Sequence, residues 1–505
     1  MSSTTVSGAC LFAQLPFPAS AIVLGFLSLL YLAYHWALPR PLPGIPYNKD
    51  ALKKILGDGA EIRKIRRARG SARNWFGQPT AKHMSRLVQV LAPFTKLVLI
   101  LSDSREAQDI LLRRNKEFDR ASRVNGALLG VIPWRRIGMR TADPQFRRNR
   151  ELVERLMTPH FLNTSMTARY MNMVRSATST DKKSETTKDV VYVFPKNEAG
   201  DDLRAHQTQQ EAVGESTTRT SPKLFHMFHN LAAPMREAFA LKTSMLNKHV
   251  SLAVRQLEAG ESVNSALDYM IQRKVSAPKK AGRQPVFDTP SMRDELYGGA
   301  QKKLRVGLRA AYAEAFDPGR QPSVAEITKR SVPYLDAVME ILRLSAPFRH
   351  LVREAMVDTI LLGHRVPKGT QVFLSISGLG FTSPSLAVDD VVRSESSKSQ
   401  CGTTTGAWDH ANPQAFVPEP WLKKTAGPFL SFSTGVRGCF DRRLAYLELQ
   451  ILMTLLLWNF ELRVLPRELN TWEQVDALTV KPAKCYVILR KPVQGQRPDQ
   501  AGILG

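Results

Sequence analysis

One cysteine lies in a segment whose other residues could prepare its sulfur for chemistry. The segment FSTGVRGCFDRRLAYLELQ spans residues 432–450 and contains Cys439. Apolar residues follow at helical spacing, which predicts Cys439 at a helix N-terminus, where amide groups and the helix dipole stabilise a thiolate. Gly435 permits a tight turn, and Arg437 adds a cation to the same loop. This pattern suits a metal ligand whose cofactor carries carboxylates; the alternative is an ordinary buried thiol.

Asp441 follows Cys439 by two residues and acts on it in two opposing ways. A carboxylate at a helix N-terminus is favourable because it complements the helix dipole. The same charge disfavours an anionic sulfur nearby, although Arg442 or Arg443 can offset part of it. We therefore expect Asp441 to hinder the thiolate more than it helps the helix.

The composition predicts a globular protein with a basic surface. The 505 residues are 43% hydrophobic and 23% charged, and their net charge is +26. Because the basic residues are spread along the chain, they favour a membrane surface or an acidic partner over nucleic acid. Four scattered cysteines fit neither a disulfide framework nor a zinc site, which indicates a reducing compartment; they are Cys10, Cys401, Cys439 and Cys485.

The N-terminal region predicts a membrane anchor. No Asp, Glu, Lys or Arg precedes Arg40, and residues 19–38 are apolar over a length that can cross a bilayer as a helix. Prolines stiffen residues 39–48 into a stalk. Basic residues follow at once, so the positive-inside rule places residues 1–18 in the lumen and the rest of the chain in the cytosol.

Residues 49–493 are predicted to form a single domain that is mainly α with small β-sheets, followed by a tail at 494–505. Residues 176–222 are polar and weakly periodic, so we expect irregular structure there. Predicted helices cover residues 105–118, 146–162, 224–274, 301–316 and 324–344; hairpins are predicted at 87–102 and around 482–483, strands within 363–376, and an exposed loop at 393–406.

Further motifs lie in a fixed order around the cysteine. Phe432, Gly435, Arg437 and Cys439 form the pattern F-x-x-G-x-R-x-C; Glu340 and Arg343 form E-x-x-R, and residues 416–421 read FVPEPW. Together these motifs resemble the cytochrome P450 haem-thiolate monooxygenases. The predicted anchor and proline-rich stalk resemble those of microsomal members, and the general character of the sequence resembles that of fungal members. The resemblance implies a cytochrome P450-like single catalytic domain behind an N-terminal transmembrane helix.

The resemblance also implies roles for individual residues around a haem, that is, iron protoporphyrin IX. Cys439 is then the axial iron ligand, and Glu340 and Arg343 form a structural ion pair behind the haem. Three arginines are then expected to bind haem propionates. The implied cofactor-binding residues are, in chain order, Arg150, Arg353, Phe432, Gly435, Arg437 and Cys439.

The implied activity is oxidation of a small lipophilic substrate, a secondary metabolite or a xenobiotic, with O2. Electrons are expected from an NADPH-dependent cytochrome reductase that docks on a basic proximal face. The other expected partner is membrane lipid, and the protein is expected to act as a monomer. Its expected location is the endoplasmic reticulum membrane, with the catalytic domain in the cytosol.

Four positions depart from the family pattern. The family's oxygen-activating helix carries [AG]-G-x-[DE]-[TS], but no acid–Thr pair follows a glycine in this pattern between residues 268 and 340, so no catalytic residue is identified. Pro420 replaces an arginine expected to complete the Glu340–Arg343 network, Phe146 replaces a tryptophan, and Asp441 replaces a glycine. Two alternatives therefore remain open: a degenerate haem-binding or non-functional family member, and a basic membrane-tethered interaction protein without cofactor.

Overall fold

The computed structural model describes most of the chain between residues 17 and 490. The described residues are 17–38, 40–69, 73–91, 97–158, 190–193, 201–216, 219, 221–259, 313–316, 322–323, 326–327, 338–399, 408, 413, 419–422, 427–459, 461–463, 474–476, 479–482 and 486–490. The predicted distal region between residues 268 and 312 lies outside them, as do Cys10, Cys401, Cys485 and the tail at 494–505.

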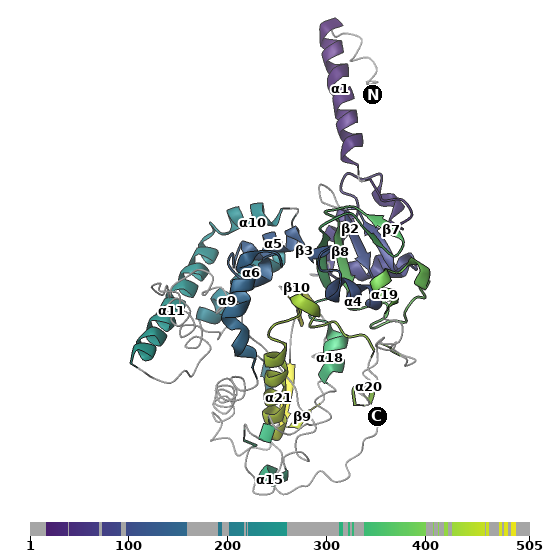
Figure 1. Cartoon of the computed structure of the whole chain (residues 1–505). Helices are drawn as coiled ribbons and strands as arrows, with labels where there is room; N and C mark the ends of the chain where they lie inside the picture. The colour runs from purple at the N-terminus through teal and green to yellow at the C-terminus, as the bar shows by residue number, and fades with distance from the viewer. Residues whose placement is uncertain are drawn as a thin grey trace, which may run out of the picture.

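A five-stranded sheet organises the N-terminal half. Its strand order is β1 (Leu87–Val90), β2 (Val98–Leu101), β8 (Gln371–Ser375), β5 (His350–Ala355) and β3 (Phe118–Arg120). Strands β1 and β2 pair antiparallel, which confirms the hairpin predicted at 87–102, and β2 pairs parallel with β8. The sheet thus joins segments that are more than 200 residues apart in sequence, and Figure 1 shows it beneath helix α1.

Helix α4 (Ser104–Leu112) follows β2 and packs on the main core. Asp103 caps it by accepting a hydrogen bond from the Glu106 amide at 2.8 Å. Residues 367–369 connect β7 (His364–Val366) to β8, and β6 (Thr359–Leu361) pairs with β7, so strands lie within 363–376 as predicted. Fully buried residues of α4 and of the sheet, such as Ile110, Leu101 and Leu374, form one apolar cluster. This cluster supports the ends of α4 and β5, which reach the candidate site.

Helices cluster on the other side of Figure 1. They are α5 (Ser122–Leu129), α6 (Pro144–Val153), α9 (Asp201–Ser216), α10 (Pro222–His229) and α11 (Ala233–Glu258). The expectation of irregular structure at 176–222 is wrong, because α9 and β4 (Val190–Val193) lie within it. Helix α9 escapes an apolar-period search because Ala205, Gln209 and Ser216 fill buried positions where large apolar residues are expected.

The C-terminal third carries the cysteine between short elements. They are α18 (Val338–Ser345), α19 (Glu395–Lys398), α20 (Glu419–Leu422), α21 (Arg442–Asn459), β9 (Glu461–Arg463), β10 (Gln474–Asp476), β11 (Val480–Pro482) and β12 (Tyr486–Arg490). The hairpin predicted around 482–483 is wrong, because β11 pairs with β10 whereas β12 pairs with β4 and β9. The loop predicted at 393–406 contains α19, whose Ser397 is fully buried.

Remaining helices are short or lie near the N-terminus. They are η2 (Lys49–Ala51), α2 (Gly59–Arg69), η3 (Arg73–Gly77), α3 (Gln78–Lys82), η4 (Arg136–Gly138), η5 (Glu154–Met157), α15 (Ala313–Phe316), η7 (Asp390–Val392) and η8 (Gly435–Arg437). The helix predicted at 146–162 corresponds to α6, which ends at Val153, and to η5, a tighter turn that follows it directly.

Helix α1 (Phe17–Ala37) covers the predicted anchor and projects from the rest of the molecule (Figure 1). Its apolar side chains are exposed, among them Ile22, Phe26 and Leu29. Within the described residues, however, no helix combines the length and hydropathy needed to cross a membrane. The spanning anchor predicted at 19–38 is therefore not confirmed.

Candidate functional site

The loop that carries Cys439 is held in a compact turn. The Cys439 amide donates to the Phe432 carbonyl at 2.7 Å, and the Gly438 amide donates to Gly435 at 2.9 Å. Gly435 has a φ of +69°, and a Cβ there would come within 2.2 Å of the Leu111 carbonyl at the end of α4. Only glycine fits such an approach. The loop leaves the Cys439 side chain exposed, so its sulfur is available to a ligand.

The electrostatics around Cys439 differ from the expected stabilised thiolate. Crowding by neighbouring atoms raises the pKa of the exposed thiol, and the charge of Asp441 raises it further. The Asp441 amide and the charges of Arg136 and Arg442 lower it, but not enough to compensate. Helix α21 begins only at Arg442, three residues beyond Cys439. Asp441 thus has the effect predicted from its charge. Metal binding itself must then supply the stabilisation of the thiolate.

Three arginines gather beside the cysteine loop; we call Arg120, Arg353 and Arg437 the arginine cluster. Arg120 on β3 and Arg353 on β5 are cross-strand neighbours, so their side chains leave the sheet on the same face. Burial, together with the charges of Arg437 and Arg353, lowers the pKa of Arg120 to about 9. Burial and the charge of Arg437 similarly lower the pKa of Arg353 to about 10. The three cations therefore destabilise one another.

The acid that offsets these charges is Asp119, which also satisfies other donors. Its carboxylate accepts from the Thr141 amide at 2.8 Å and from the Thr141 hydroxyl at 2.7 Å. The Arg437 Nε lies 3.9 Å from Asp119 Oδ1, which is too far for a hydrogen bond. Among the described residues, Asp119 is the carboxylate that raises the pKa of all three arginines. The cluster thus carries a surplus of positive charge and fits a ligand with two carboxylates, as haem has.

The other contacts of the cluster are neutral. Arg437 donates to the Met139 carbonyl, and its guanidinium lies 4.4 Å from the centre of the Phe146 ring. Arg120 donates from Nε to the Ile137 carbonyl at 2.8 Å. Phe146, the residue in place of a tryptophan, therefore keeps its packing role through a cation–π contact with Arg437.

Arg150 is not part of this cluster. It is exposed on α6 and donates to the Val436 carbonyl at 3.3 Å, so it touches the loop from outside. Arg120 was not predicted, because its proximity to Arg353 depends on a strand pairing that no local motif reveals. Arg136 was also missed; it is buried, and its guanidinium lies 4.0 Å from the centre of the Phe440 ring, beside Cys439.

Glu340 and Arg343 form the predicted buried pair on α18. Arg343 Nη2 lies 2.6 Å from Glu340 Oε1, and both side chains are almost fully buried. The expectation that Pro420 leaves this pair without a third partner is wrong. Trp421 donates from its indole Nε1 to Glu340 Oε2 at 2.9 Å.

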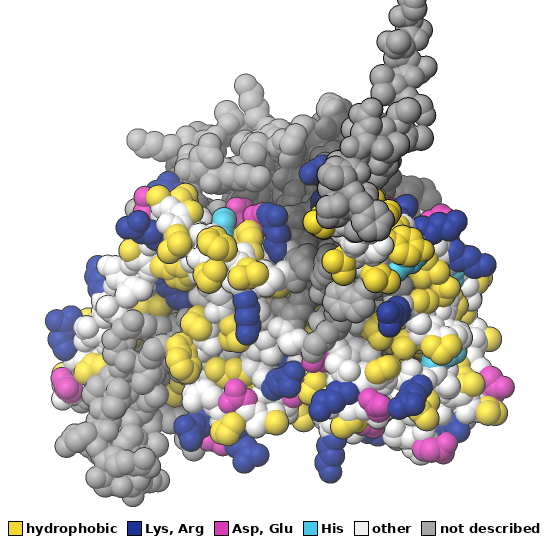
Figure 2. Space-filling model, turned by 90° about the horizontal axis from the view of Figure 1, so that it is seen from above, with side chains coloured by type: hydrophobic (Ala, Val, Ile, Leu, Met, Phe, Trp, Pro, Cys, Tyr) yellow, Lys and Arg dark blue, Asp and Glu magenta, His cyan; other side chains and the backbone are white. Residues whose placement is uncertain are grey.

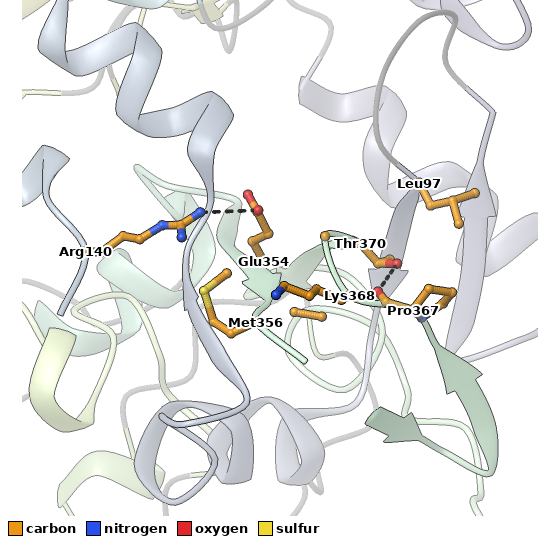
Figure 3. Close-up of a pocket in the computed structure, with 9 residues that line it drawn as sticks. Leu97, Arg140, Glu354, Met356, Pro367, Lys368 and Thr370 are labelled. Carbon is orange, nitrogen blue, oxygen red and sulfur yellow. Dashed lines mark hydrogen bonds and ion pairs between the residues drawn. The ribbon is translucent and has the colours of Figure 1, made fainter. Parts of the chain in front are cut away.

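A cavity of about 540 Å³ lies on another part of the sheet and does not reach Cys439. Figure 3 shows Arg140 and Glu354 paired on one side of it, with Nη2 and Oε1 3.4 Å apart. Glu354 follows Arg353 in β5, so its side chain points to the opposite face of the sheet. The cavity is lined by Leu97, Arg140, Glu354, Ala355, Met356, Pro367, Lys368, Gly369 and Thr370.

The exposed Cys439 sulfur can bind a metal, and the arginine cluster beside it can bind carboxylates. Together they suit a metal cofactor that carries acidic groups. Within the described residues, no cluster of three His, Cys, Asp or Glu side chains offers another metal site. Residues 268–340, where the family's distal motif is expected, lie largely outside the part of the chain that the structure describes.

Comparison with known proteins identifies the family. The family model described as "Cytochrome P450" matches residues 301–381 and 406–489. The chain is 30% identical to the cytochrome P450 monooxygenase TRI13 of Fusarium sporotrichioides, over 92% of this chain and 97% of that protein. It is 29% identical to the cytochrome P450 monooxygenase xilC of Penicillium crustosum, over 92% and 95%. The chain therefore belongs to the cytochrome P450 family, and the family and fold imply a haem cofactor.

A solved structure supports the fold independently. A crystal structure of a cytochrome P450 (CYP102L1) superposes with a TM-score of 0.61 and 15% identity, covering 90% of this chain and all of that one. The predicted cytochrome P450-like fold of helices and small sheets is thus confirmed. The roles of individual site residues remain predictions that rest on the geometry described above.

Proposed function

We propose that this protein is a haem-dependent monooxygenase that oxidises a small lipophilic substrate, a secondary metabolite or a xenobiotic. The observation that carries the proposal is the exposed Cys439 loop beside a cluster with surplus cations. Family membership supports monooxygenase chemistry, and the relatives named above are fungal monooxygenases. The chain acts as a monomer, which size-exclusion chromatography with light scattering tests.

In this proposal the residues hold and orient the cofactor. Cys439 would ligate the haem iron through its sulfur, and Arg120, Arg353 and Arg437 would bind the propionates. Gly435 lets the loop pack against α4, so Phe432 and its carbonyl can fix the Cys439 backbone. Bound haem supplies the iron at which O2 is activated. The protein's own contribution at the sulfur is the Asp441 amide, which donates to it and favours the thiolate.

Electrons come from an NADPH-dependent reductase that binds the face around Val436. Exposed arginines surround that position on three elements: Arg113 follows α4, Arg147 and Arg150 lie on α6, and Arg442 begins α21. This positive surface suits an acidic partner, and steering by it weakens with ionic strength. Reduction by the reductase should therefore slow as salt rises, and Arg147→Glu should slow it further without changing haem content.

The decisive experiment is the difference spectrum of the reduced, CO-bound full chain. A red-shifted thiolate Soret band supports the proposal, and Cys439→Ala should abolish it. Failure of the wild-type chain to take up haem would overturn it and favour the cofactor-free interaction protein.

A second candidate is a haem-binding protein without turnover. It is favoured by the charge of Asp441 beside the sulfur, and by a sequence between residues 268 and 340 that lacks the motif [AG]-G-x-[DE]-[TS]. NADPH consumption coupled to product formation, in a screen of lipophilic substrates, supports the monooxygenase. NADPH consumption without product, despite a thiolate Soret band, supports the second candidate.

We further propose that the protein is attached to the endoplasmic reticulum membrane with its catalytic domain in the cytosol. Besides α1, the segment of α10 exposes apolar side chains at Leu224, Met227, Phe228 and Leu231. Helices α1 and α10 lie at the same end of the molecule in Figure 1. Figure 2, viewed from that end, shows hydrophobic side chains gathered among lysines and arginines. Resistance of the membrane-bound protein to carbonate extraction tests a spanning anchor, and its extraction indicates surface attachment instead.

A further inference from the structure

The buried acid behind the cysteine loop has an unexpected third partner. We propose that Trp421 takes the place of the arginine missing at Pro420, and that its indole N–H positions the Cys439 loop through Glu340. Trp421 is thus a positioning residue of the haem site. The proposal rests on haem binding at Cys439, and the experiments below separate failure of one from failure of the other.

The geometry at Glu340 favours this role. Its Oε1 accepts from Arg343 Nη2 at 2.6 Å, and its Oε2 accepts from Arg343 Nε at 2.8 Å and from Trp421 Nε1 at 2.9 Å. Glu340 is fully buried, so a missing donor would leave carboxylate capacity unsatisfied at high cost. An indole adds the donor without adding a second cation, so the pair remains neutral beside the haem site.

A second tryptophan encloses the other member of the pair. The Trp408 ring centre lies 4.5 Å from the Arg343 guanidinium and 5.4 Å from the Trp421 ring centre. Its own N–H donates to the Pro428 carbonyl at 3.1 Å. Gly427 packs so closely on this indole that a Cβ would come within 2.9 Å of it. The two indoles therefore fix both the ion pair and the start of the segment that leads to Cys439.

A continuous series of contacts connects Trp421 to the cysteine loop. The Trp421 ring packs edge-on against Phe429 at 5.1 Å, and Phe429 packs on Phe432 at 6.3 Å between ring centres. The Phe432 carbonyl then accepts the Cys439 amide hydrogen bond. In parallel, the Ser431 hydroxyl donates to the Leu342 carbonyl of α18 at 3.2 Å. Displacement of Trp421 should therefore displace the backbone that sets the sulfur position.

The test is Trp421→Phe, which removes the N–H and keeps most of the ring. The readout is the ratio of thiolate-ligated to thiol-ligated haem in the reduced, CO-bound protein, and a matched control variant separates a specific change in this ratio from a general loss of stability. We expect Trp421→Phe to lower it about tenfold, the effect of one hydrogen bond to a buried charge. Trp75→Phe, at a buried tryptophan in a different core cluster, is the matched control and should leave it unchanged.

Rescue makes the test specific. Adding Pro420→Arg to Trp421→Phe should restore the ratio, because the arginine is a donor at the family's usual position. A ratio that stays at the wild-type level in Trp421→Phe overturns the proposal. So does a loss that Trp75→Phe reproduces, or a loss that Pro420→Arg fails to restore.

A haem-independent measurement distinguishes the two levels of inference. In haem-free protein, a double-mutant cycle of Trp421→Phe and Glu340→Gln should show coupling of about fivefold in the unfolding equilibrium constant. If the wild-type chain binds no haem but the coupling is present, the proposed function fails while the Trp421–Glu340 interaction stands. Absence of coupling overturns the role of Trp421 whether or not haem binds.

Discussion

Two groups of arginines lie near the two ends of helix α4, and they differ in how many carboxylates neutralise them. At the start of α4, Arg393 donates to both oxygens of Asp103, at 3.0 and 3.1 Å, and lies near Glu106. At its far end, the acid that the arginine cluster approaches among the described residues is Asp119, at 3.9 Å from Arg437. The first group is neutralised by its own carboxylates. In the second, positive charge exceeds negative charge among the described residues, which is the balance expected of a site for an acidic ligand rather than of a structural ion network.

The pKa directions express the same difference. Burial raises the pKa of Asp103, but hydrogen bonds from Arg393 and the charge of Arg86 outweigh it and bring the value below 3.8. In the arginine cluster, burial lowers the pKa values of all three members, and neighbouring arginines act in the same direction: Arg437 on Arg120 and Arg353, and Arg136 on Arg437. A charge-neutralising substitution should therefore have opposite consequences for stability in the two groups.

The largest effect is expected for Arg393→Met. This substitution leaves Asp103 and Glu106 buried with too little positive charge, and should lower the free energy of unfolding by about 3–5 kcal/mol. Thermal and chemical unfolding of the full chain measure it. Arg365→Met is the control, because its ion pair with Asp358 is exposed to solvent and its loss should change stability far less. A loss at Arg393 no larger than at Arg365 would mean that the first group is not a buried network.

The next effect is expected for Gly435→Ala, because Gly435 is where the cysteine loop meets α4. The new Cβ must both adopt a φ of +69° and displace the Leu111 carbonyl, so we expect a loss of about 3 kcal/mol together with reduced haem content. Gly378→Ala separates the two causes, since Gly378 has a φ of +83° but open space around it. It should cost only about 1–2 kcal/mol. Equal losses at both positions would contradict the close approach at Leu111.

The sequence was informative wherever a role depends on local spacing. The turn at Gly435 and the Glu340–Arg343 pair follow from patterns within a few residues, and the structure contains both. Cys439 lies in the loop that its motif predicts, but helix α21 begins only at Arg442. Arg120 and Trp421 could not be found in this way. Arg120 reaches the site by pairing of β3 with a strand more than 200 residues later, and Trp421 replaces a missing charge with a neutral donor.

The prediction of some secondary-structure elements failed for a related physical reason. Helix α9 buries small and polar residues, which carry little periodic signal, and its stability comes from packing against α5, α10 and α11. Strand β12 likewise pairs with β4 and β9, and no local turn in the sequence specifies these pairings. Arg150 was assigned to the propionates by motif position alone, whereas its exposure on α6 places it outside the cluster.

A smaller, pH-dependent effect is expected for Glu448 on α21, a buried acid whose pKa is shifted in the opposite direction to that of Asp103. Burial raises its pKa from 4.5 to about 7. Between these two pH values the folded chain holds a proton that the unfolded chain has lost, so this group's contribution lowers stability as pH rises from 4.5 to 7. Glu448→Gln cannot ionise and should be more stable than wild type by about 1–3 kcal/mol at pH 8, with little difference at pH 4. A pH-independent difference in unfolding temperature would contradict this.

The smallest change in stability is expected for Arg120→Met, but its sign is the most informative. In haem-free protein, removal of one of three mutually repelling buried cations should raise the free energy of unfolding by about 1–2 kcal/mol, opposite to Arg393→Met. In haem-loaded protein the same substitution removes a propionate partner, so haem should transfer faster to an acceptor protein. Arg150→Met is the control and should change neither measurement, because Arg150 is exposed. If Arg120→Met instead destabilises the haem-free chain as Arg393→Met does, the cluster is an internal structural network. The surplus positive charge would then be no evidence for an acidic cofactor.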